Sequence, residues 1–294
     1  MNRVRKQIHY SRAEKELLTG YHIGVGVLDS GIFPHEDLKD QIRAFRDFTN
    51  KYQLPYDETG HGTHVCGILA GNGRVLHGKY KGMAPCCDLY VGKILNKRGE
   101  GSLKTLLRGL QWLLSIAESC NIRVINISVS SIASARPEEQ RKLYELFQYA
   151  YENNILIVTA AGNFGPGDNT ISRLGDTPYV ICVGCHDGDL ENGGLRCQDC
   201  SGRGPGENVW KKPDVVAPGT QIISCQAAYG KYVARSGTSM ATPIVSGLLA
   251  LAWEKYPYLN AMQLKRKLIL SATDLGESYL MQGAGMVDVE KMLS

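Results

Sequence analysis

Residues 236–243, Ser-Gly-Thr-Ser-Met-Ala-Thr-Pro, place a serine shortly before a long apolar run, and this stretch is the strongest indication of the fold. Residues 244–253 are apolar and rich in small side chains, which predicts a buried helix that begins near Ser239. The free N–H groups and the positive dipole end of a helix N-terminus favour negative charge on the Ser239 hydroxyl. Pro243 suits a first helical turn, where no N–H is needed. A serine hydroxyl becomes a good nucleophile when a nearby base takes its proton.

Two earlier segments offer that base and a group to orient it. Residues 60–67, Gly-His-Gly-Thr-His-Val-Cys-Gly, contain His61, and histidine is the side chain that titrates near neutrality. Residues 25–32, Val-Gly-Val-Leu-Asp-Ser-Gly-Ile, form a strand-like run with Asp29 near its end. A carboxylate on the second ring nitrogen fixes the histidine tautomer and stabilises the imidazolium. Residues 160–163, Ala-Ala-Gly-Asn, add the side-chain amide of Asn163.

Each of these residues also has a structural explanation when it is taken alone. Ser239 is typical of a helix N-cap, and Asp29 and Asn163 are typical of turns. Together, in the order Asp, His, Ser, the motifs resemble those of the subtilisin-like serine proteases, the subtilases. The resemblance implies that Ser239 is the nucleophile, His61 the base, Asp29 its orienter and Asn163 an oxyanion donor beside the Ser239 N–H. It assigns a structural role to His64.

The resemblance also implies a fold and a domain organisation. It implies an α/β fold, a subtilisin-like three-layer α/β/α sandwich around a mostly parallel sheet. Residues 1–19 are expected to form a short basic N-terminal tail or helix, and residues 20–294 the catalytic domain. The sequence supports this, because buried strand-like runs alternate with helical spacing, a pattern of parallel sheets with right-handed crossovers. The strand-like runs are residues 23–28, 88–95, 124–128, 155–160 and 178–184, and the helical ones are 103–117 and 138–151.

The resemblance implies three groups of substrate-binding residues. Gly99, Glu100 and Gly101 are expected to pair as an edge strand with extended substrate, a mode that depends little on substrate sequence. Ser128, Val129 and Ser130, followed by Ser131, stand where the family usually has Ser-[Leu/Met]-Gly-Gly. Those two glycines normally line the specificity pocket, so the serines that replace them, Ser130 and Ser131, are expected to narrow or polarise it. Gly162 precedes the oxyanion donor.

The sequence predicts no metal or other cofactor. Many subtilisins carry a calcium loop at the position of residues 71–82, but Asn72 is the only side-chain amide there and no carboxylate is present. Calcium needs six or more oxygen ligands, usually with carboxylates among them. Calcium is therefore possible but unsupported, although Asp37 matches a ligand position of the family.

The cysteines pose a second metal question. Cys182 with Cys185 and Cys197 with Cys200 form a doubled C-x-x-C, a pattern typical of zinc sites. Residues three apart on a strand point to opposite faces, which favours packed or reactive thiols at the first pair instead. Cys66, close behind the base, is predicted to be a small buried side chain. Nine cysteines, with no apolar leader segment, favour a reducing compartment and hence the cytoplasm.

Composition limits the partners. The chain has 294 residues, 43% of them hydrophobic and 21% charged, and a net charge of +4 spread along its length. These values are typical of a globular protein and indicate no nucleic-acid partner and no membrane. We predict a serine endopeptidase that cleaves peptide or protein substrates through an acyl-enzyme, in intracellular turnover or in precursor (leader peptide) processing. The alternatives are a non-catalytic subtilase-fold binding or regulatory module and, from the cysteine pairs alone, a zinc-dependent redox module.

Overall fold

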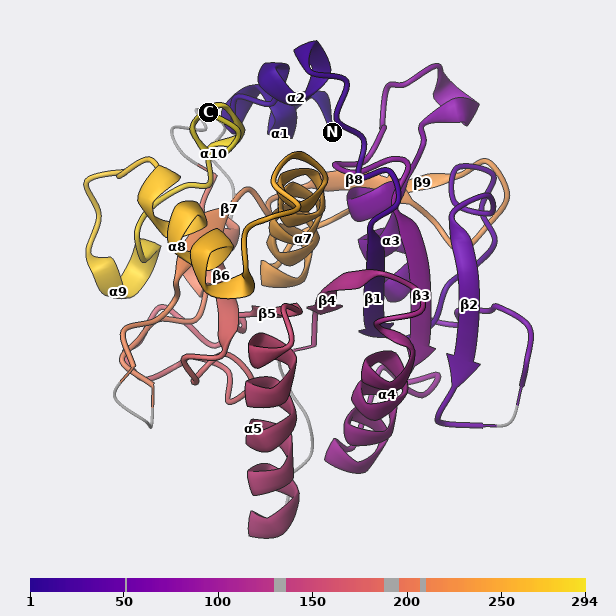
Figure 1. Cartoon of the computed structure of the whole chain (residues 1–294), viewed down its shortest axis with the longest axis horizontal. Helices are drawn as coiled ribbons and strands as arrows, with labels where there is room; N and C mark the ends of the chain where they lie inside the picture. The colour runs from indigo at the N-terminus through magenta and orange to yellow at the C-terminus, as the bar shows by residue number, and fades with distance from the viewer. Residues whose placement is uncertain (51, 130–135, 188–195, 207–209) are drawn as a thin grey trace.

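A seven-stranded sheet forms the centre of the molecule, shown by a computed structural model that describes residues 1–50, 52–129, 136–187, 196–206 and 210–294. Its strand order is β2-β3-β1-β4-β5-β6-β7, and every neighbouring pair is parallel (Figure 1). The strands are β1 (Gly24–Asp29), β2 (Ile42–Asp47), β3 (Asp88–Lys93), β4 (Ile122–Ile127), β5 (Leu156–Ala160), β6 (Val180–Cys185) and β7 (Val215–Ala217). Two further strands, β8 (Ile222–Cys225) and β9 (Tyr232–Arg235), pair antiparallel as a separate hairpin.

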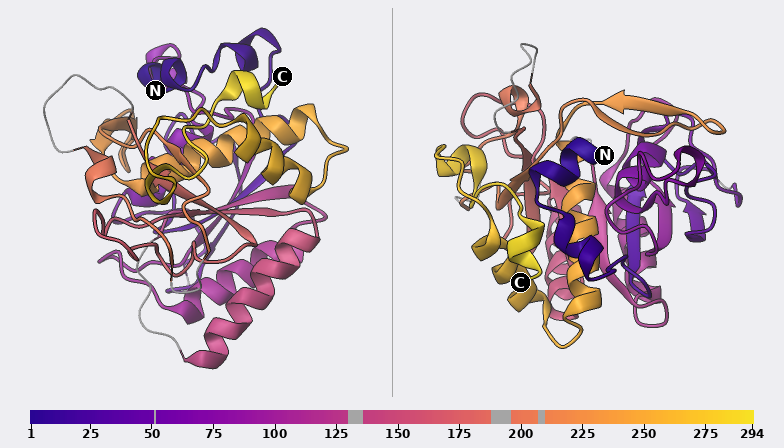
Figure 2. Two further views of the ribbon diagram at one scale, coloured as in Figure 1. Left: turned by 90° about the vertical axis from the view of Figure 1, so that its left-hand side faces the viewer. Right: turned by 90° about the horizontal axis from the view of Figure 1, so that it is seen from above.

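Helices cover both faces of this sheet. The left view of Figure 2 shows α4 (Leu103–Ile116) and α5 (Pro137–Glu152) below the sheet, with α7 (Thr238–Lys255) and α8 (Ala261–Ser271) above it. Helix α3 (His61–Ala70) packs beside α7. The remaining helices are short: α1 (Asn2–Gln7), α2 (Ser11–Lys15), the 3-10 helix η1 (Arg74–Leu76), α6 (Cys197–Cys200), α9 (Tyr279–Gln282) and α10 (Val289–Met292). The predicted α/β sandwich around a mostly parallel sheet is confirmed.

The core lies on both faces, which explains the apolar strand sequences. In β1, Val25 and Val27 join the cluster beneath α3 and α7, whereas Leu28 joins the cluster beneath α4. Strands buried on both faces lose the alternation of polar and apolar residues. Helix α7 is buried from Thr238 to Trp253, as expected for a helix that is apolar on all sides.

The N-terminal segment packs against the C-terminal one. Ile8 and Ala13 are fully buried, and the backbone carbonyl of Ile8 accepts a hydrogen bond from the Val289 N–H at 2.8 Å. His9 Nδ1 lies 2.9 Å from Asp288 Oδ2. Helix α2 and the C-terminus of the chain therefore both lie beside α10 (Figure 1). The division at residue 20 into a tail and a catalytic domain stays a prediction.

One local expectation is wrong. Pro243 was expected in the first turn of its helix, but α7 begins at Thr238 and Pro243 lies in its second turn. A proline there has no N–H for the carbonyl four residues earlier, which belongs to Ser239. The Ser239 carbonyl thus has no partner at the usual position along the helix. Ser239 itself is the second residue of α7.

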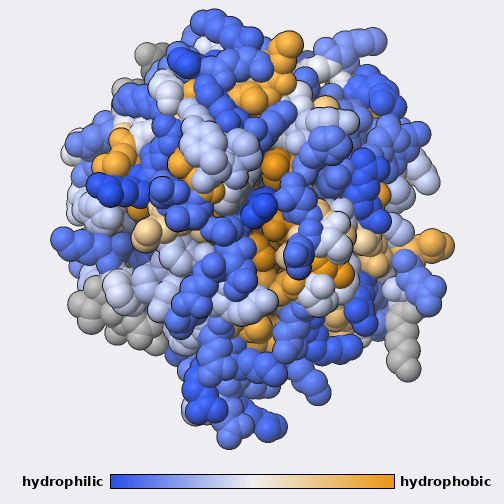
Figure 3. Space-filling view, viewed as in Figure 1, coloured by the Kyte–Doolittle hydropathy of each residue, from blue (hydrophilic) through white to orange (hydrophobic). Residues whose placement is uncertain are grey.

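The surface seen from the side of Figure 1 is largely hydrophilic, with apolar side chains gathered toward the middle (Figure 3). Within the described residues, no helix has both the length and the apolar character needed to cross a membrane.

Candidate active site

Asp29 and His61 form a direct pair. Asp29 is the last residue of β1 and is fully buried, and His61 is the first residue of α3. Their contact is 2.7 Å between Asp29 Oδ1 and His61 Nδ1. Burial alone would lower the pKa of His61, but the charge and the hydrogen bond of Asp29 outweigh it, so the pKa of His61 is raised. The carboxylate thus stabilises the protonated ring and holds Nδ1 as the donor.

Glycines let the two elements approach this closely. A Cβ on Gly62 would lie 2.1 Å from the carbonyl oxygen of Gly31, so no other residue fits there without a shift of the backbone. Gly31 itself has φ +123°, a conformation that favours glycine. The Gly62 N–H also donates to the Ser30 hydroxyl at 2.9 Å. These contacts fix the start of α3 against the end of β1.

Asp57 supports the same junction, and the sequence analysis missed it. Its Oδ2 accepts the backbone N–H of Thr63 at 2.8 Å and the Thr63 hydroxyl at 2.7 Å. Its Oδ1 accepts the Gly60 N–H at 2.9 Å and the Ser30 hydroxyl at 2.8 Å. A carboxylate that binds free N–H groups at a helix N-terminus stabilises that end. The available signal was an aspartate a few residues before a helix start.

Ser239 lies in the first turn of a different helix, α7. Gly237 precedes it with φ 148° and ψ 165°, a conformation open essentially to glycine alone. The Ser239 hydroxyl donates to the main-chain carbonyl of Ser128 at 2.7 Å, just beyond the end of β4. Its hydrogen-bond partner in this state is therefore Ser128 and not His61.

Asn163 lies beside the same helix start, because it follows β5 in a loop that reaches α7. Its Oδ1 accepts both the Thr238 N–H and the Thr238 hydroxyl at 3.1 Å. A Cβ on Gly237 would lie 3.6 Å from Asn163 Nδ2 and 3.9 Å from the Ser239 backbone nitrogen. Two N–H donors, Asn163 Nδ2 and the Ser239 N–H, therefore lie around the same small space beside Gly237.

Comparison with known proteins identifies the fold and its chemistry. The sequence model of the subtilase family matches residues 20–287. The chain belongs to the subtilase family. Serine protease AprX of Bacillus subtilis (strain 168) is 35% identical over 94% of this chain and 67% of its own length. Subtilisin DY of Bacillus licheniformis is 33% identical over 95% of this chain and 94% of its own.

Solved structures agree with the sequence relatives. Sphericase superposes with a TM-score of 0.79 and 30% identity, over 92% of each chain. The S41 psychrophilic protease gives 0.80 and 29%, also over 92% of each. The subtilase is therefore subtilisin-like in fold, and it is a serine endopeptidase that acts on peptide or protein substrates. The family prediction is confirmed.

His64, the second histidine of the motif, contacts backbone groups of the β8–β9 hairpin. Its Nε2 lies 3.0 Å from the carbonyl oxygens of both Ile222 and Val233, which belong to β8 and β9. Burial lowers the pKa of His64 to about 3, so the ring is neutral. His64 thus joins α3 to the hairpin.

The predicted substrate-binding residues lie in two separate places. Residues 95–101 form a turn between β3 and α4, in which Leu95 bridges Gly101 and Gly99 has φ +76°. Glu100 is exposed in this turn, and its backbone carbonyl accepts from Asn96. Ser128, Val129 and Gly162 are buried at the ends of β4 and β5, and Ser130 lies outside the described residues.

The surroundings of Asp37 do not suit calcium. Its two carboxylate oxygens already accept from the Val75 N–H at 2.9 Å and the Tyr232 hydroxyl at 2.6 Å. The nearest metal-binding side chains are His35 and Cys225, whose ligand atoms and that of Asp37 lie within 4.8 Å of one another. A thiol and an imidazole are poor calcium ligands. The His35 ring also accepts the Asp37 N–H and contacts a backbone carbonyl, so both its nitrogens are engaged.

The cysteines of the doubled motif do not all gather. Cys182 packs in a small cluster with Ala161 and Ile171, whereas Cys185 and Cys197 lie in the main core cluster. The predicted opposition of residues 182 and 185 is confirmed. Cys66 is fully buried, as predicted, and burial raises its pKa well above the usual value.

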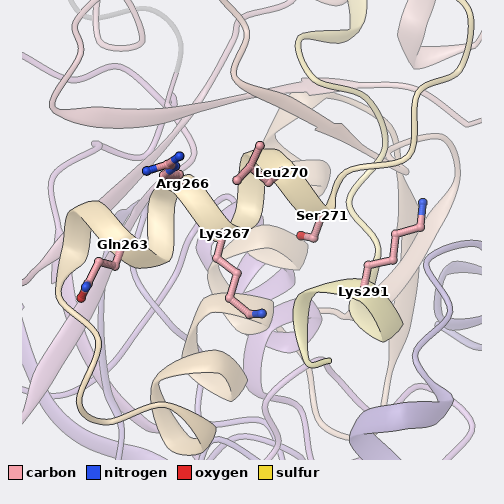
Figure 4. Close-up of a pocket in the computed structure, with 6 residues that line it drawn as sticks. All are labelled: Gln263, Arg266, Lys267, Leu270, Ser271 and Lys291. Atoms are coloured by element: carbon pink, nitrogen blue, oxygen red, sulfur yellow. The ribbon is translucent and has the colours of Figure 1, made fainter.

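A hollow on the surface of α8 lies apart from all of these residues (Figure 4). Three cationic side chains contribute to it. Its lining residues are Gln263, Arg266, Lys267, Leu270, Ser271 and Lys291. None of them belongs to the predicted active site.

Proposed function

We propose that Asp29, His61 and Ser239 form the catalytic triad of this serine endopeptidase. The observation that carries the proposal is the 2.7 Å contact between the buried Asp29 carboxylate and His61 Nδ1. It leaves Nε2 as the basic nitrogen of the neutral ring. The family places its nucleophile at the position of Ser239.

The proposed reaction begins when the Ser239 hydroxyl turns from Ser128 toward His61. His61 Nε2 takes the hydroxyl proton as Ser239 Oγ bonds to the substrate carbonyl carbon. The Asn163 Nδ2 and the Ser239 N–H donate to the oxyanion, which is why both donors must flank it. His61 then gives its proton to the leaving amine, and water repeats the sequence on the acyl-enzyme.

We also propose how the substrate is held. The backbone around Gly99, Glu100 and Gly101 pairs with an extended peptide. Ser128, Val129 and Gly162 line the pocket for the residue before the scissile bond. The position of Ser128 supports this, because its carbonyl already contacts the nucleophile.

Labelling with a fluorophosphonate probe tests the triad. We expect rapid labelling of the intact protein and none of Ser239→Ala, and we expect chelator to leave the rate unchanged because no metal is required. Labelling of Ser239→Ala at the rate of the intact protein would refute Ser239 as nucleophile. Loss of labelling in chelator, restored by calcium, would refute the prediction that no metal is needed.

We further propose that the enzyme acts in the cytoplasm. All nine cysteines are free thiols, which suits a reducing compartment. General protein turnover and dedicated precursor processing are both consistent with this location. Digestion of unfolded proteins separates them, because turnover requires many cleavage sites and leader-peptide removal requires one.

A further inference from the structure

Three cysteines outside the candidate active site lie close together, because α6 packs against β6. Cys185 ends β6, and Cys197 and Cys200 begin and end α6. Cys185 and Cys197 are 1% and 3% exposed, whereas Cys200 is partly exposed. The sulfurs of Cys197 and Cys185 both pack against Gly219, and Cys200 lies one turn of α6 after Cys197. Cys197 is therefore the centre of a sulfur cluster that proteolysis does not use.

The spacing of Cys197 and Cys200 suits a disulfide. Residues three apart in one helical turn lie on the same side, at a Cα separation of roughly 5 Å, inside the range that a disulfide spans. The Cys200 thiol already points back along the helix, because it donates to the Cys197 carbonyl at 3.3 Å. Cys182 packs against Gly175 instead, so the doubled motif supplies three neighbouring thiols and not four zinc ligands.

The cluster packs against the loop between β7 and β8, which contacts the residue before α7. A Cβ on Gly219 would lie 2.5 Å from the Cys185 sulfur and 3.3 Å from the Cys197 sulfur, so both thiols pack against this residue. The Gly219 carbonyl accepts the Gly237 N–H at 3.0 Å. Gly237 is the N-cap of α7, two residues before Ser239. Two steps of direct contact therefore connect Cys197 to the start of the nucleophile helix.

Aspartate and threonine side chains brace the same loop. Asp187 Oδ1 accepts the N–H groups of Gly219 at 3.1 Å and of Thr220 at 3.0 Å. The Thr220 hydroxyl accepts the Cys197 N–H at 2.8 Å. Movement of Cys197 would thus shift the 219–220 loop through contacts of both its sulfur and its backbone N–H.

We propose that Cys197 and Cys200 form a reversible disulfide by exchange with a low-molecular-weight disulfide, and that this bond changes the packing of Gly219 beneath Gly237. The partly exposed Cys200 reacts first. Its thiolate attacks the small disulfide, forms a mixed disulfide and releases one thiol, which takes up the proton lost by Cys200. The Cys197 thiolate then attacks the Cys200 sulfur and releases the second thiol. Two cysteine thiols are oxidised, and the small disulfide is reduced to two thiols.

The thiols of the cluster are expected to react slowly at neutral pH, both with small disulfides and with peroxide. Burial raises the pKa of Cys185 to about 11, and contact with Cys197 raises the pKa of Cys200. Few thiolates are therefore present at neutral pH, and the thiolate is the reactive form. Long equilibration with a defined redox buffer is the appropriate test.

The first experiment maps the bond. Ser239→Ala protein, which cannot digest itself, is equilibrated with glutathione at ratios from fully reduced to fully oxidised, then alkylated, digested and analysed by mass spectrometry. We expect Cys197 and Cys200 to lose alkylation together, to appear in one disulfide-linked peptide, and to recover with dithiothreitol. Full alkylation of both at every ratio, or a bond from Cys197 to Cys185 instead, would overturn the proposal.

The second experiment measures the coupling to the nucleophile. The fluorophosphonate labelling rate of the wild-type enzyme is compared between the two forms, and we expect at least a threefold change that dithiothreitol reverses. Cys200→Ser should lose this response, whereas the control Cys120→Ser, another partly exposed cysteine, should keep it. An equal rate in both forms would refute the coupling. Only this readout rests on the proposed role of Ser239, because mapping needs no activity.

Discussion

Replacing Asp29 by asparagine keeps the shape of the side chain and removes its charge. In the transition state His61 is an imidazolium whose Nδ1 lies 2.7 Å from Asp29 Oδ1. Two unit charges about 4 Å apart interact by about 4 kcal/mol at an effective dielectric constant of about 20. At 1.36 kcal/mol per tenfold change, this loss lowers the rate about a thousandfold. An amide also permits the wrong tautomer of the ring, so we expect a total loss of about 10⁴ in kcat.

The pH profile separates this explanation from simple misfolding. His61 acts as a base only when neutral, and Asp29 raises its pKa, so wild-type activity falls on acidification through that raised pKa. In Asp29→Asn the remaining activity should persist to lower pH, because the protonated ring has lost its partner. Measurement of kcat/KM for a peptide substrate against pH gives both quantities.

The control for this experiment is Asp40→Asn, which removes an exposed carboxylate that pairs with Arg74 at 2.9 Å. It should retain wild-type activity and the wild-type profile. The reasoning would be refuted if Asp29→Asn remained within tenfold of the wild type, or if its acidic limb did not move. Either result would mean that Asp29 does not stabilise the protonated base.

Three further predictions follow from the same geometry. Asn163→Ala should lower kcat by about 10²–10³ with little change in KM, because only the oxyanion loses a hydrogen-bond donor. A rise in KM with kcat unchanged, measured by steady-state kinetics, would contradict this. Gly62→Ala should lower the free energy of unfolding by about 1–3 kcal/mol or more, since its Cβ would lie 2.1 Å from a main-chain oxygen. The control Gly167→Ala should not, because its Cβ would meet only the Thr170 methyl group, at an ordinary contact distance of 4.0 Å. Burial lowers the pKa of Lys265 from 10.5 to about 8, so the folded state binds fewer protons than the unfolded chain, and the free energy of unfolding gains up to about 3 kcal/mol as pH rises between these values. Urea unfolding of Ser239→Ala protein at several pH values should show this gain, and the same protein with Lys265→Met added should lack it. An equal dependence of the free energy of unfolding on pH in both proteins would contradict the prediction.

The fold was predictable where residues are buried on both sides of the sheet. Runs such as β4 and β5 are apolar throughout, and the helical spacing of α4 repeats over four turns, so each element is specified by local sequence. Strand β2 was missed because it is an edge strand in which Arg43 and Arg46 interrupt the apolar residues. Charges protect such an edge from pairing with other chains, and they also hide its periodicity.

The sequence motifs named the candidate site residues, but not the residues that support them in the structure. Four of the hydrogen bonds that Asp57 accepts depend on how residues 30, 60 and 63 meet in three dimensions. The contact of Cys197 with Cys185 has the same origin, since it joins α6 to β6. Periodicity and spacing report local structure, whereas such contacts follow from the packing of distant elements.

Ser128 shows how this packing positions Ser239. Its carbonyl accepts from the Ser239 hydroxyl at 2.7 Å, and its own hydroxyl accepts from Asn126 Nδ2 at 2.9 Å. Asn126 Oδ1 in turn accepts from the Ser246 hydroxyl at 2.9 Å, two turns further along α7. Buried polar groups of this kind are costly to leave unpaired, so the three bonds fix the register of α7 against β4. The proposed nucleophile, Ser239, is thus positioned by hydrogen bonds along its own helix, while the proposed base, His61, is positioned separately, by α3 and β1.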